Sequence, residues 1–403
     1  MTLRKLKFIP NSSSIVALCL VAILMGCSST PKRNPVPPEL VKEVGIPGVP
    51  EARFWSDELP KFSAERLAKL SDAGYRRKFS GIYGKSHHYL AISGGGANGA
   101  YGAGLLNGWS ESGKRPKFTM VTGVSTGALT APFAFLGSDY DDELKKIYTT
   151  TSTKDIIDKR SLLTVAFSDS VADTKPLQQL IAQYITVDMI DAIAWEHNRG
   201  RRLFIATLNL EAGQPMVWSI GEIAASDYPH RIELIHDILR ASAAIPVAFP
   251  PVVIPVEFNG NRYDEMHVDG GTGMQVFVYP SAIDWQLIRK KLKIKGTPRI
   301  YVIRNSFLDP RYKHVKSKIA PIGSRSIDSL IRTQGIGNLY HIYAQCKRDG
   351  NDFNLAYIPS EFTPEPSESF DPVYMEKLFD YGYRLARKGY SWEKEPPYFS
   401  VIR

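Results

Sequence analysis

Ser125 is the residue whose neighbours in this 403-residue chain point most directly to chemistry. It is the central residue of Gly123-Val124-Ser125-Thr126-Gly127, which fits the pattern Gly-x-Ser-x-Gly. In that pattern the serine occupies a sharp turn between a strand and a helix, and the small glycines let the two elements pack closely. The positive end of the helix dipole favours the alkoxide and the tetrahedral oxyanion of an attacking serine. We therefore predict that Ser125 is a nucleophile; the structural alternative is a buried turn serine.

A nucleophilic serine needs a base, and none of the eight histidines has an acidic neighbour in a pattern typical of a catalytic triad. His267 is the nearest candidate, because it stands two residues before Asp269 and would share a strand face with it. Asp269-Gly270-Gly271 offers a carboxylate instead, at the end of a short strand-like segment. A carboxylate with its usual pKa is a weak base, so Asp269 would have to be partly desolvated or tightly hydrogen-bonded.

A second glycine-rich segment, Ser93-Gly94-Gly95-Gly96-Ala97-Asn98-Gly99, follows an apolar strand-like run. Without a Cβ in the way, the backbone N–H groups of such a loop can approach a phosphate or a developing oxyanion. The dinucleotide fingerprint is not matched, because no acidic residue follows at about 20 residues, and the Gly-Lys-Ser/Thr of a nucleotide P-loop is absent from the segment. A tight turn between strand and helix is the structural alternative.

The elements around these motifs alternate between strand and helix character from about residue 60 onward, which favours a parallel or mixed α/β sheet. Strands are expected at 89–93, 118–122, 202–210, 216–220 and 299–304. Helices are expected from the glycine loop to about 112, at 126–136, from about 232 to before Pro246, and at 326–347 and 371–388. Both motifs then lie where a predicted strand ends and a helix begins.

Taken in order, the three motifs resemble those of the patatin-like phospholipase family. A fourth block, Ala241 to Val252, resembles the family's Ala- and Ser-rich helix end followed by proline and a strand. The resemblance covers about residues 87–275. It implies an α/β fold, a three-layer α/β/α sandwich with a central, mostly parallel sheet, to which this chain would add a C-terminal helical extension. It also implies that the site needs no metal and no cofactor.

The resemblance implies a Ser–Asp dyad in place of a triad. Ser125 would attack an ester carbonyl, Asp269 would take and return the proton, and water would hydrolyse the acyl-enzyme. The oxyanion hole would be formed by the backbone N–H groups of Gly94, Gly95, Gly96 and Ala97. The residues that support these motifs are Asn98, Gly99, Gly123, Gly127, Gly270 and Gly271. Many family members carry Arg or Lys where Asn98 stands, so charge assistance from that position is weaker here.

The N-terminus has the features of a bacterial lipoprotein signal. A positive start precedes the apolar run from Ile15 to Met25, and Gly26 then stands directly before Cys27. The run is short of the roughly 20 residues that span a bilayer. We expect residues 1–26 to be a signal peptide and Cys27 to be lipidated; a simple cleaved signal is the alternative. In lipoproteins a serine after the cysteine, here Ser28, indicates the outer membrane, so we expect an envelope location facing the periplasm.

The remaining chain divides by composition into a proline-rich segment at 27–60, predicted to be an extended tether, and an N-terminal extension at 61–86. A catalytic core at 87–275 follows, and residues 276–403 would complete or cap it. The third cysteine of the chain, Cys346, lies outside the signal region and is expected to be a buried small residue on a helix. Three cysteines exclude both a disulfide-stapled miniprotein and a four-cysteine zinc site.

The formal net charge of +9, which falls to +6 without residues 1–26, is spread along the chain. It suits a membrane surface and gives no nucleic-acid footprint. The main hypothesis is a membrane-anchored serine acyl-ester hydrolase of the phospholipase or lysophospholipase type, acting on a phospholipid or another acyl ester. An acyltransferase using the same acyl-enzyme and a non-catalytic lipid-binding protein of the envelope are the alternatives.

Overall fold

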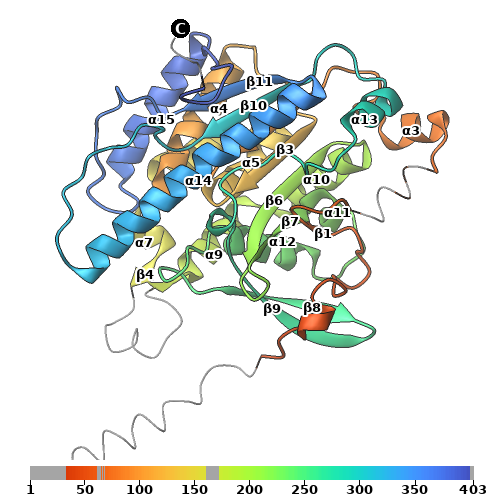
Figure 1. Cartoon of the computed structure of the whole chain (residues 1–403), viewed down its shortest axis with the longest axis horizontal. Helices are drawn as coiled ribbons and strands as arrows, with labels where there is room; N and C mark the ends of the chain where they lie inside the picture. The colour runs from red at the N-terminus through yellow and green to blue at the C-terminus, as the bar shows by residue number, and fades with distance from the viewer. Residues whose placement is uncertain (1–32, 61–64, 66, 68, 160–171, 400–403) are drawn as a thin grey trace, which may run out of the picture.

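The structure is a computed structural model of the chain, and it describes residues 33–60, 65, 67, 69–159 and 172–399 (Figure 1). The predicted signal peptide and Cys27 lie outside the described residues. None of the helices in the described ranges is both long and apolar enough to cross a bilayer.

A sheet of nine strands forms the centre of the molecule, and most of its neighbouring central strands are parallel. Its main path runs in the order β1-β7-β6-β3-β2-β10-β11, and the antiparallel pair β8–β9 joins it through β6. Strands β6, β3, β2, β10 and β11 are mutually parallel, whereas β7 runs antiparallel to β6 and β1 antiparallel to β7. The strands are β1 Arg53–Trp55, β2 His88–Ile92, β3 Met120–Val124, β6 Arg202–Asn209, β7 Gln214–Ser219, β8 Val252–Phe258, β9 Asn261–Asp269, β10 Arg299–Arg304 and β11 Asp352–Tyr357.

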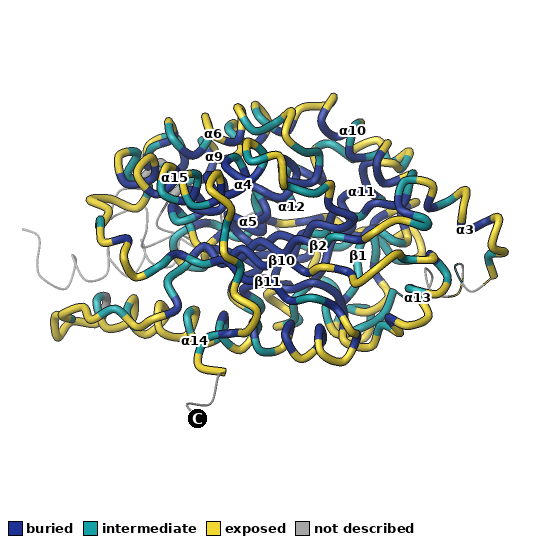
Figure 2. The backbone as a smooth tube through the Cα atoms, turned by 90° about the horizontal axis from the view of Figure 1, so that it is seen from above, coloured by how far each residue is buried: buried dark blue, intermediate teal, exposed yellow. Residues whose placement is uncertain are grey.

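Helices cover both faces of this sheet, so the predicted three-layer α/β/α sandwich is confirmed (Figure 2). One face carries α4 Gly99–Glu111, α5 Thr126–Leu136, α6 Asp141–Thr150, α9 Lys175–Tyr184, α10 Val187–Asn198, α11 Ile220–Ala224, α12 Arg231–Ser242 and α15 Pro372–Arg387. The other face carries α13 Trp285–Leu292 and α14 Ile319–Asp349. The short elements are α3 Asp72–Lys78, α7 Thr153–Ile156 and a separate antiparallel pair, β4 Asp158–Lys159 with β5 Ala172–Asp173.

The apolar run of β2 shows how the sequence builds two cores. Because side chains alternate along a strand, Leu90 and Ile92 enter the larger core and Tyr89 and Ala91 the smaller one. A strand buried on both faces has no polar alternation, which accounts for its continuous apolar sequence. The predicted bounds 126–136 and 299–304 match α5 and β10, whereas α14 begins seven residues before the predicted start.

The prediction of an extended tether is wrong for the part of segment 27–60 that the structure describes. Residues 33–60 lie along the sheet and the β8–β9 pair (Figure 1). Val44, Ile46 and Val49 are buried in the larger core, and β1 pairs with β7. Prolines restrict φ but do not prevent the apolar residues between them from being buried. The prediction from proline density overlooked the free energy that this burial contributes to folding.

Residues 276–403 complete the fold and are more than a helical extension. They supply two sheet strands, β10 and β11, together with α14 and α15. Helix α15 packs so tightly on α4 that a Cβ on Gly104 would lie 2.0 Å from the carbonyl oxygen of Phe379. Cys346 is a buried free thiol on α14, which confirms the prediction made for it.

Candidate functional site

Ser125 occupies the turn between β3 and α5, where its backbone adopts φ 55° and ψ −127°. A positive φ is unfavourable for a residue with a side chain and persists only where the surroundings enforce it. The residues on either side of this turn, Gly123 and Gly127, have no room for a side chain. A Cβ on Gly127 would lie 2.3 Å from the carbonyl oxygen of Ile92, and one on Gly123 would lie 2.5 Å from that of Gly127. The glycines are therefore required by close approach of the backbones, as the Gly-x-Ser-x-Gly pattern predicts.

The register of β6 explains how Asp269 reaches Ser125 across 144 residues of sequence. Strand β3 pairs with β6 up to Val124, which lies opposite Ala206. The next residue of β6, Thr207, pairs instead with Asp269, the last residue of β9. The ends of β3 and β9 thus meet along the same edge of β6. The Ser125 hydroxyl donates a hydrogen bond of 2.6 Å to Oδ2 of Asp269.

The carboxylate of Asp269 is 5% exposed and has a second hydrogen bond, because the amide of Gly271 donates to its Oδ1 at 2.7 Å. Burial raises the pKa of Asp269 from 3.8 to about 6, although the hydrogen bonds from Ser125 and Gly271 act in the opposite direction. Such a carboxylate is a stronger base than an exposed aspartate and is still mainly ionised at neutral pH. The arrangement can therefore accept a proton from the serine hydroxyl.

Ser242, the last residue of α12, positions the backbone of the serine turn. Its Oγ accepts a hydrogen bond of 2.9 Å from the amide of Ser125 and donates one of 2.7 Å to the carbonyl of Ala206. The hydroxyl therefore connects the turn to β6. The Ala- and Ser-rich block contained Ser242, but its sequence gave no indication of this role.

The glycine loop lies directly beside the serine. A Cβ on Gly94 would lie 3.1 Å from the Cβ of Ser125. However, the amide of Gly94 donates to the carbonyl oxygen of Gln275 at 3.3 Å, so it is already occupied in this structure. Among the described residues, no acceptor binds the amides of Gly95 and Gly96, and both residues are at least partly accessible. Of the four residues predicted for the oxyanion hole, Gly95 and Gly96 thus combine accessibility with an amide that has no acceptor, whereas Ala97 is a buried residue.

Two asparagines hold the loop in place. Asn305 donates its backbone N–H to Ser93 Oγ at 2.9 Å and accepts the amide of Gly102 with its side-chain oxygen at 3.0 Å. Asn98, where many family members carry a cation, accepts a hydrogen bond of 2.6 Å from the hydroxyl of Tyr374 on α15. Its side chain thus fastens the start of α4 to the C-terminal helix.

Comparison with known proteins gives a family match and a structural match. Residues 90–280 match the family model described as patatin-like phospholipase. This part of the chain is therefore similar to patatin-like phospholipase domains. Among solved structures, the crystal structure of VipD from Legionella pneumophila matches with 12% sequence identity and a TM-score of 0.37. That match covers 75% of this chain and 66% of VipD, so this chain spans just under two thirds of its length. A search of curated proteins found no match.

Gln275 joins the two halves of the patatin-like site, and sequence reasoning missed it. Its carbonyl accepts the amide of Gly94, and its Nε2 donates to the carbonyl oxygen of Gly271 at 2.5 Å. Its Oε1 accepts a hydrogen bond of 3.3 Å from Nη1 of Arg304. A single residue therefore connects the glycine loop, through its backbone carbonyl, with the Asp-Gly-Gly turn and β10, through its side chain. The segment after that turn contains no recognisable pattern that could have identified Gln275.

Arg304 is a buried cation at the carboxyl end of β10, with 1% of its surface exposed. Burial lowers the pKa of its guanidinium to about 10, and among the described residues it forms no salt bridge. It therefore remains charged at neutral pH without a carboxylate partner. The sequence contained a signal that went unused: an arginine directly after the apolar run Ile300–Ile303, where burial of the charge would require a reason.

His267, the alternative base, is not placed against Ser125. Its ring bonds to Thr207 Oγ1 at 2.9 Å and to Glu265 at 3.1 Å, and burial lowers its pKa. Glu265 is also paired with Arg53 from the N-terminal segment. Along β9 the side chains at 265, 267 and 269 share a face, as the spacing predicted, but the first two belong to a buried ionic cluster that secures residues 33–60.

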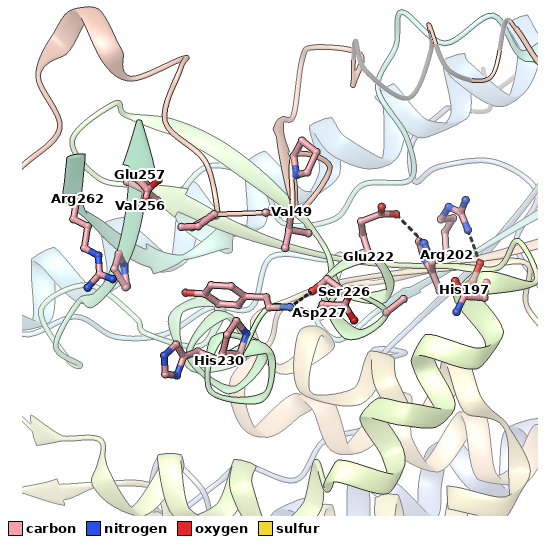
Figure 3. Close-up of a pocket in the computed structure, with 18 of the residues that line it drawn as sticks. Val49, His197, Arg202, Glu222, Ser226, Asp227, His230, Val256, Glu257 and Arg262 are labelled. Atoms are coloured by element: carbon pink, nitrogen blue, oxygen red, sulfur yellow. Dashed lines mark hydrogen bonds and ion pairs between the residues drawn. The ribbon is translucent and has the colours of Figure 1, made fainter. Parts of the chain in front are cut away.

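A hollow of about 940 Å³ lies away from the dyad (Figure 3). It is bounded by residues 47–50, by the end of α10 and by the segment before α12. His197 pairs there with Glu222 at 2.8 Å, and Arg202 donates to the carbonyl of His197. Neither Ser125 nor Asp269 lines it. Within the described ranges, no group of three or more histidine, cysteine, aspartate or glutamate side chains is arranged to hold a metal ion.

Proposed function

We propose that this chain is a serine acyl-ester hydrolase of the phospholipase or lysophospholipase type, which acts through a Ser125–Asp269 dyad. The observation that carries the proposal is the hydrogen bond of 2.6 Å between the serine hydroxyl and a buried carboxylate whose pKa is raised to about 6. The patatin-like phospholipase domain at 90–280 supports a lipid ester as the substrate class.

In the first half of the reaction, Ser125 Oγ forms a bond to the ester carbonyl carbon as its proton passes to Asp269. The carbonyl oxygen becomes an oxyanion, and the amides of Gly95 and Gly96 lie where they could donate to it. Collapse breaks the bond to the alcohol oxygen, which leaves with the proton from Asp269. The acyl group remains as an ester on Ser125.

In the second half, water replaces the alcohol. It loses a proton to Asp269, its oxygen attacks the acyl carbon, and the bond to Ser125 Oγ breaks as the serine recovers a proton. The products are a free fatty acid and the original dyad. The charged Arg304, at the same edge of the sheet, favours negative charge in this region.

A fluorophosphonate probe tests the activated serine directly. We expect labelling of the wild type, none of Ser125→Ala, and strongly reduced labelling of Asp269→Asn. Asp227→Asn, which makes the same replacement of a carboxylate oxygen by an amide nitrogen at an exposed aspartate, is the matched control and should label like the wild type. Absence of labelling in a folded wild-type protein would refute the proposal. Release of fatty acid from phospholipid and lysophospholipid micelles then identifies the substrate class.

We also propose that the protein is lipid-anchored through Cys27 in the bacterial cell envelope, at the periplasmic face of the outer membrane. This proposal rests on the sequence of residues 1–28 alone. Incorporation of labelled palmitate into the wild type, and its loss in Cys27→Ser, is the expected result. Incorporation that persists in the variant would contradict it.

A further inference from the structure

The N-terminal half of α14 exposes an apolar surface that nothing in the described structure covers. Ile319 is 93% exposed, Leu330 70%, Ile327 55% and Ile322 51%. Figure 2 shows this half of α14 projecting past the helices and strands of the main body, with exposed residues along its length. The other half packs its apolar side chains, from Leu339 to Cys346, against the sheet.

The same region is basic. Between residues 309 and 334 there are six lysines and arginines but only two aspartates. Lys313, Lys316 and Lys318 precede the helix and are exposed. Exposed isoleucines beside exposed lysines are the combination by which an interfacial helix binds an anionic lipid surface. A neutral apolar partner would not use the lysines, and an acidic soluble partner would not use the isoleucines.

The position of this helix relative to the dyad adds a second, independent observation. Because β10 and β11 are parallel neighbours, the helix that connects them runs back along the sheet, and its N-terminal half lies at the carboxyl edge of the strands (Figure 1). Ser125 and Asp269 lie at that same edge. Helix α14 also touches the site directly, because Gln334 donates to the carbonyl of Gly273 and Asn338 accepts the amide of Gln275, both at 2.9 Å.

We propose that the N-terminal half of α14, residues 319–331, lies on the surface of an anionic phospholipid membrane and presents the carboxyl edge of the sheet to it. The proposal rests on the proposed function, because it identifies the surface from which the hydrolase takes its lipid. The apolar side chains enter the boundary between headgroups and acyl chains while the lysines remain among the headgroups. This contact is separate from any anchor at Cys27, and it orients the site.

Hydrogen exchange measured by mass spectrometry tests the contact locally, in the full chain, whether or not an anchor also holds the protein to vesicles. The Ser125→Ala variant is used so that the lipids stay intact. With vesicles of phosphatidylglycerol and phosphatidylethanolamine, we expect slower exchange across 316–333 and no change across 339–348. Vesicles of phosphatidylcholine alone should give less protection.

Two other results would overturn the proposal. Bound protein whose segment 316–333 exchanges as fast as in solution would show that the membrane contact lies elsewhere. Protection of this segment without vesicles, increasing with protein concentration, would identify a second copy of the chain as the partner that covers it.

Activity measurements on matched variants separate docking from catalysis. In Ile322→Ser/Leu330→Ser, hydrolysis of vesicle phospholipid should fall at least about tenfold, because two apolar side chains no longer contribute to binding. Hydrolysis of a soluble short-chain ester should stay at the wild-type rate. Val187→Ser/Leu287→Ser, which changes two exposed apolar residues on other helices, should leave both rates unchanged.

Equal loss on both substrates, or no loss on vesicles, would overturn the docking proposal. If the wild type hydrolyses neither substrate, the proposed function fails instead, and the exchange result with Ser125→Ala still decides whether the helix binds the membrane.

Discussion

Replacing Asp269 by asparagine should abolish hydrolysis and at the same time make the folded protein more stable at neutral pH. Asparagine has almost the same shape as aspartate, so its side-chain oxygen can still accept the Gly271 amide and its amide group can donate to Ser125. What the substitution removes is the negative charge of a buried group. The ionised carboxylate is required by the reaction but opposed by its surroundings, since burial is what raises its pKa.

The size and sign of the effect follow from linkage. The folded protein holds the proton with a pKa of about 6, whereas the unfolded chain has the ordinary value of 3.8. Between these values the folded state is protonated and the unfolded state is not, so the stability contributed by this group is complete below 3.8 and is lost as pH rises through about 6. The loss is about 3 kcal/mol at pH 7.5 and about 1 kcal/mol at pH 4.5. Asp269→Asn does not suffer this loss.

Urea unfolding at pH 4.5 and 7.5, followed by tryptophan fluorescence, provides the test. We expect the free energy of unfolding of Asp269→Asn to exceed that of the wild type by an amount that grows by about 2 kcal/mol between the two pH values. Asp227→Asn makes the same change of net charge at an exposed position and is the control. A stability difference that does not change with pH would refute the assignment of a raised pKa to Asp269, even if the variant is inactive.

Three further predictions concern neighbouring parts of the site. In the wild type, kcat/KM for a soluble ester should fall about tenfold per pH unit below about 6 and level off above it, because Asp269 must be ionised; a profile with no acid limb would contradict this. Ser242→Ala should lower kcat about tenfold or more with little change in KM or in circular dichroism, because a buried Ser125 amide left without its acceptor costs about 1–3 kcal/mol. Burial would raise the pKa of Glu265, but the charge and hydrogen bonds of Arg53 and His267 outweigh burial and hold this pKa at about 2. Glu265→Gln should therefore destabilise the protein by about 3 kcal/mol at pH 7. That loss should shrink as pH falls from 4.5 toward 2, and urea titrations at pH 7 and pH 3 would check it.

The elements that carry the motifs were predictable from the sequence because each is a local pattern. The apolar run at 89–93, the Ala-rich stretch after Ser125 and the proline that stops α12 each indicate an element without knowledge of the rest of the chain. The glycines flanking Ser125 likewise report a local requirement, namely that two backbones approach too closely for a Cβ. Bounds such as 126–136 therefore agree with the structure.

The contacts between motifs were not predictable in the same way, because they depend on sheet register. Nothing in the residues of β6 shows that it pairs with β3 up to Ala206 and with β9 from Thr207 onward, although this change of partner brings Ser125 and Asp269 together. The pairing of Ser125 with Asp269 was instead inferred from the order of the three motifs, which resembles that of the patatin-like phospholipase family. Gln275 lies outside those motifs, and so its connection between the glycine loop and the Asp-Gly-Gly turn was missed.

The error over residues 33–60 has a different cause. Proline density was taken as a property of the whole segment, whereas burial is decided residue by residue. Arg53 pairs with the buried Glu265, and Trp55 is 6% exposed at the edge of the sheet. An arginine two residues before a tryptophan, at the end of a proline-rich stretch, was the overlooked sign that this segment contacts the folded domain.

Three unfavourable features gather at the carboxyl edge of the sheet: the positive φ of Ser125, the buried carboxylate of Asp269 and the buried charge of Arg304. None of them would persist in isolation, because a small local rearrangement would relieve each one. They persist because the hydroxyl of Ser242 and the side chain of Gln275 connect them to strands packed on both faces, so that relief at one point would break contacts elsewhere. Stability and reactivity are therefore opposed at Asp269, and the substitution that abolishes the chemistry should also be the one that lowers the energy of the fold.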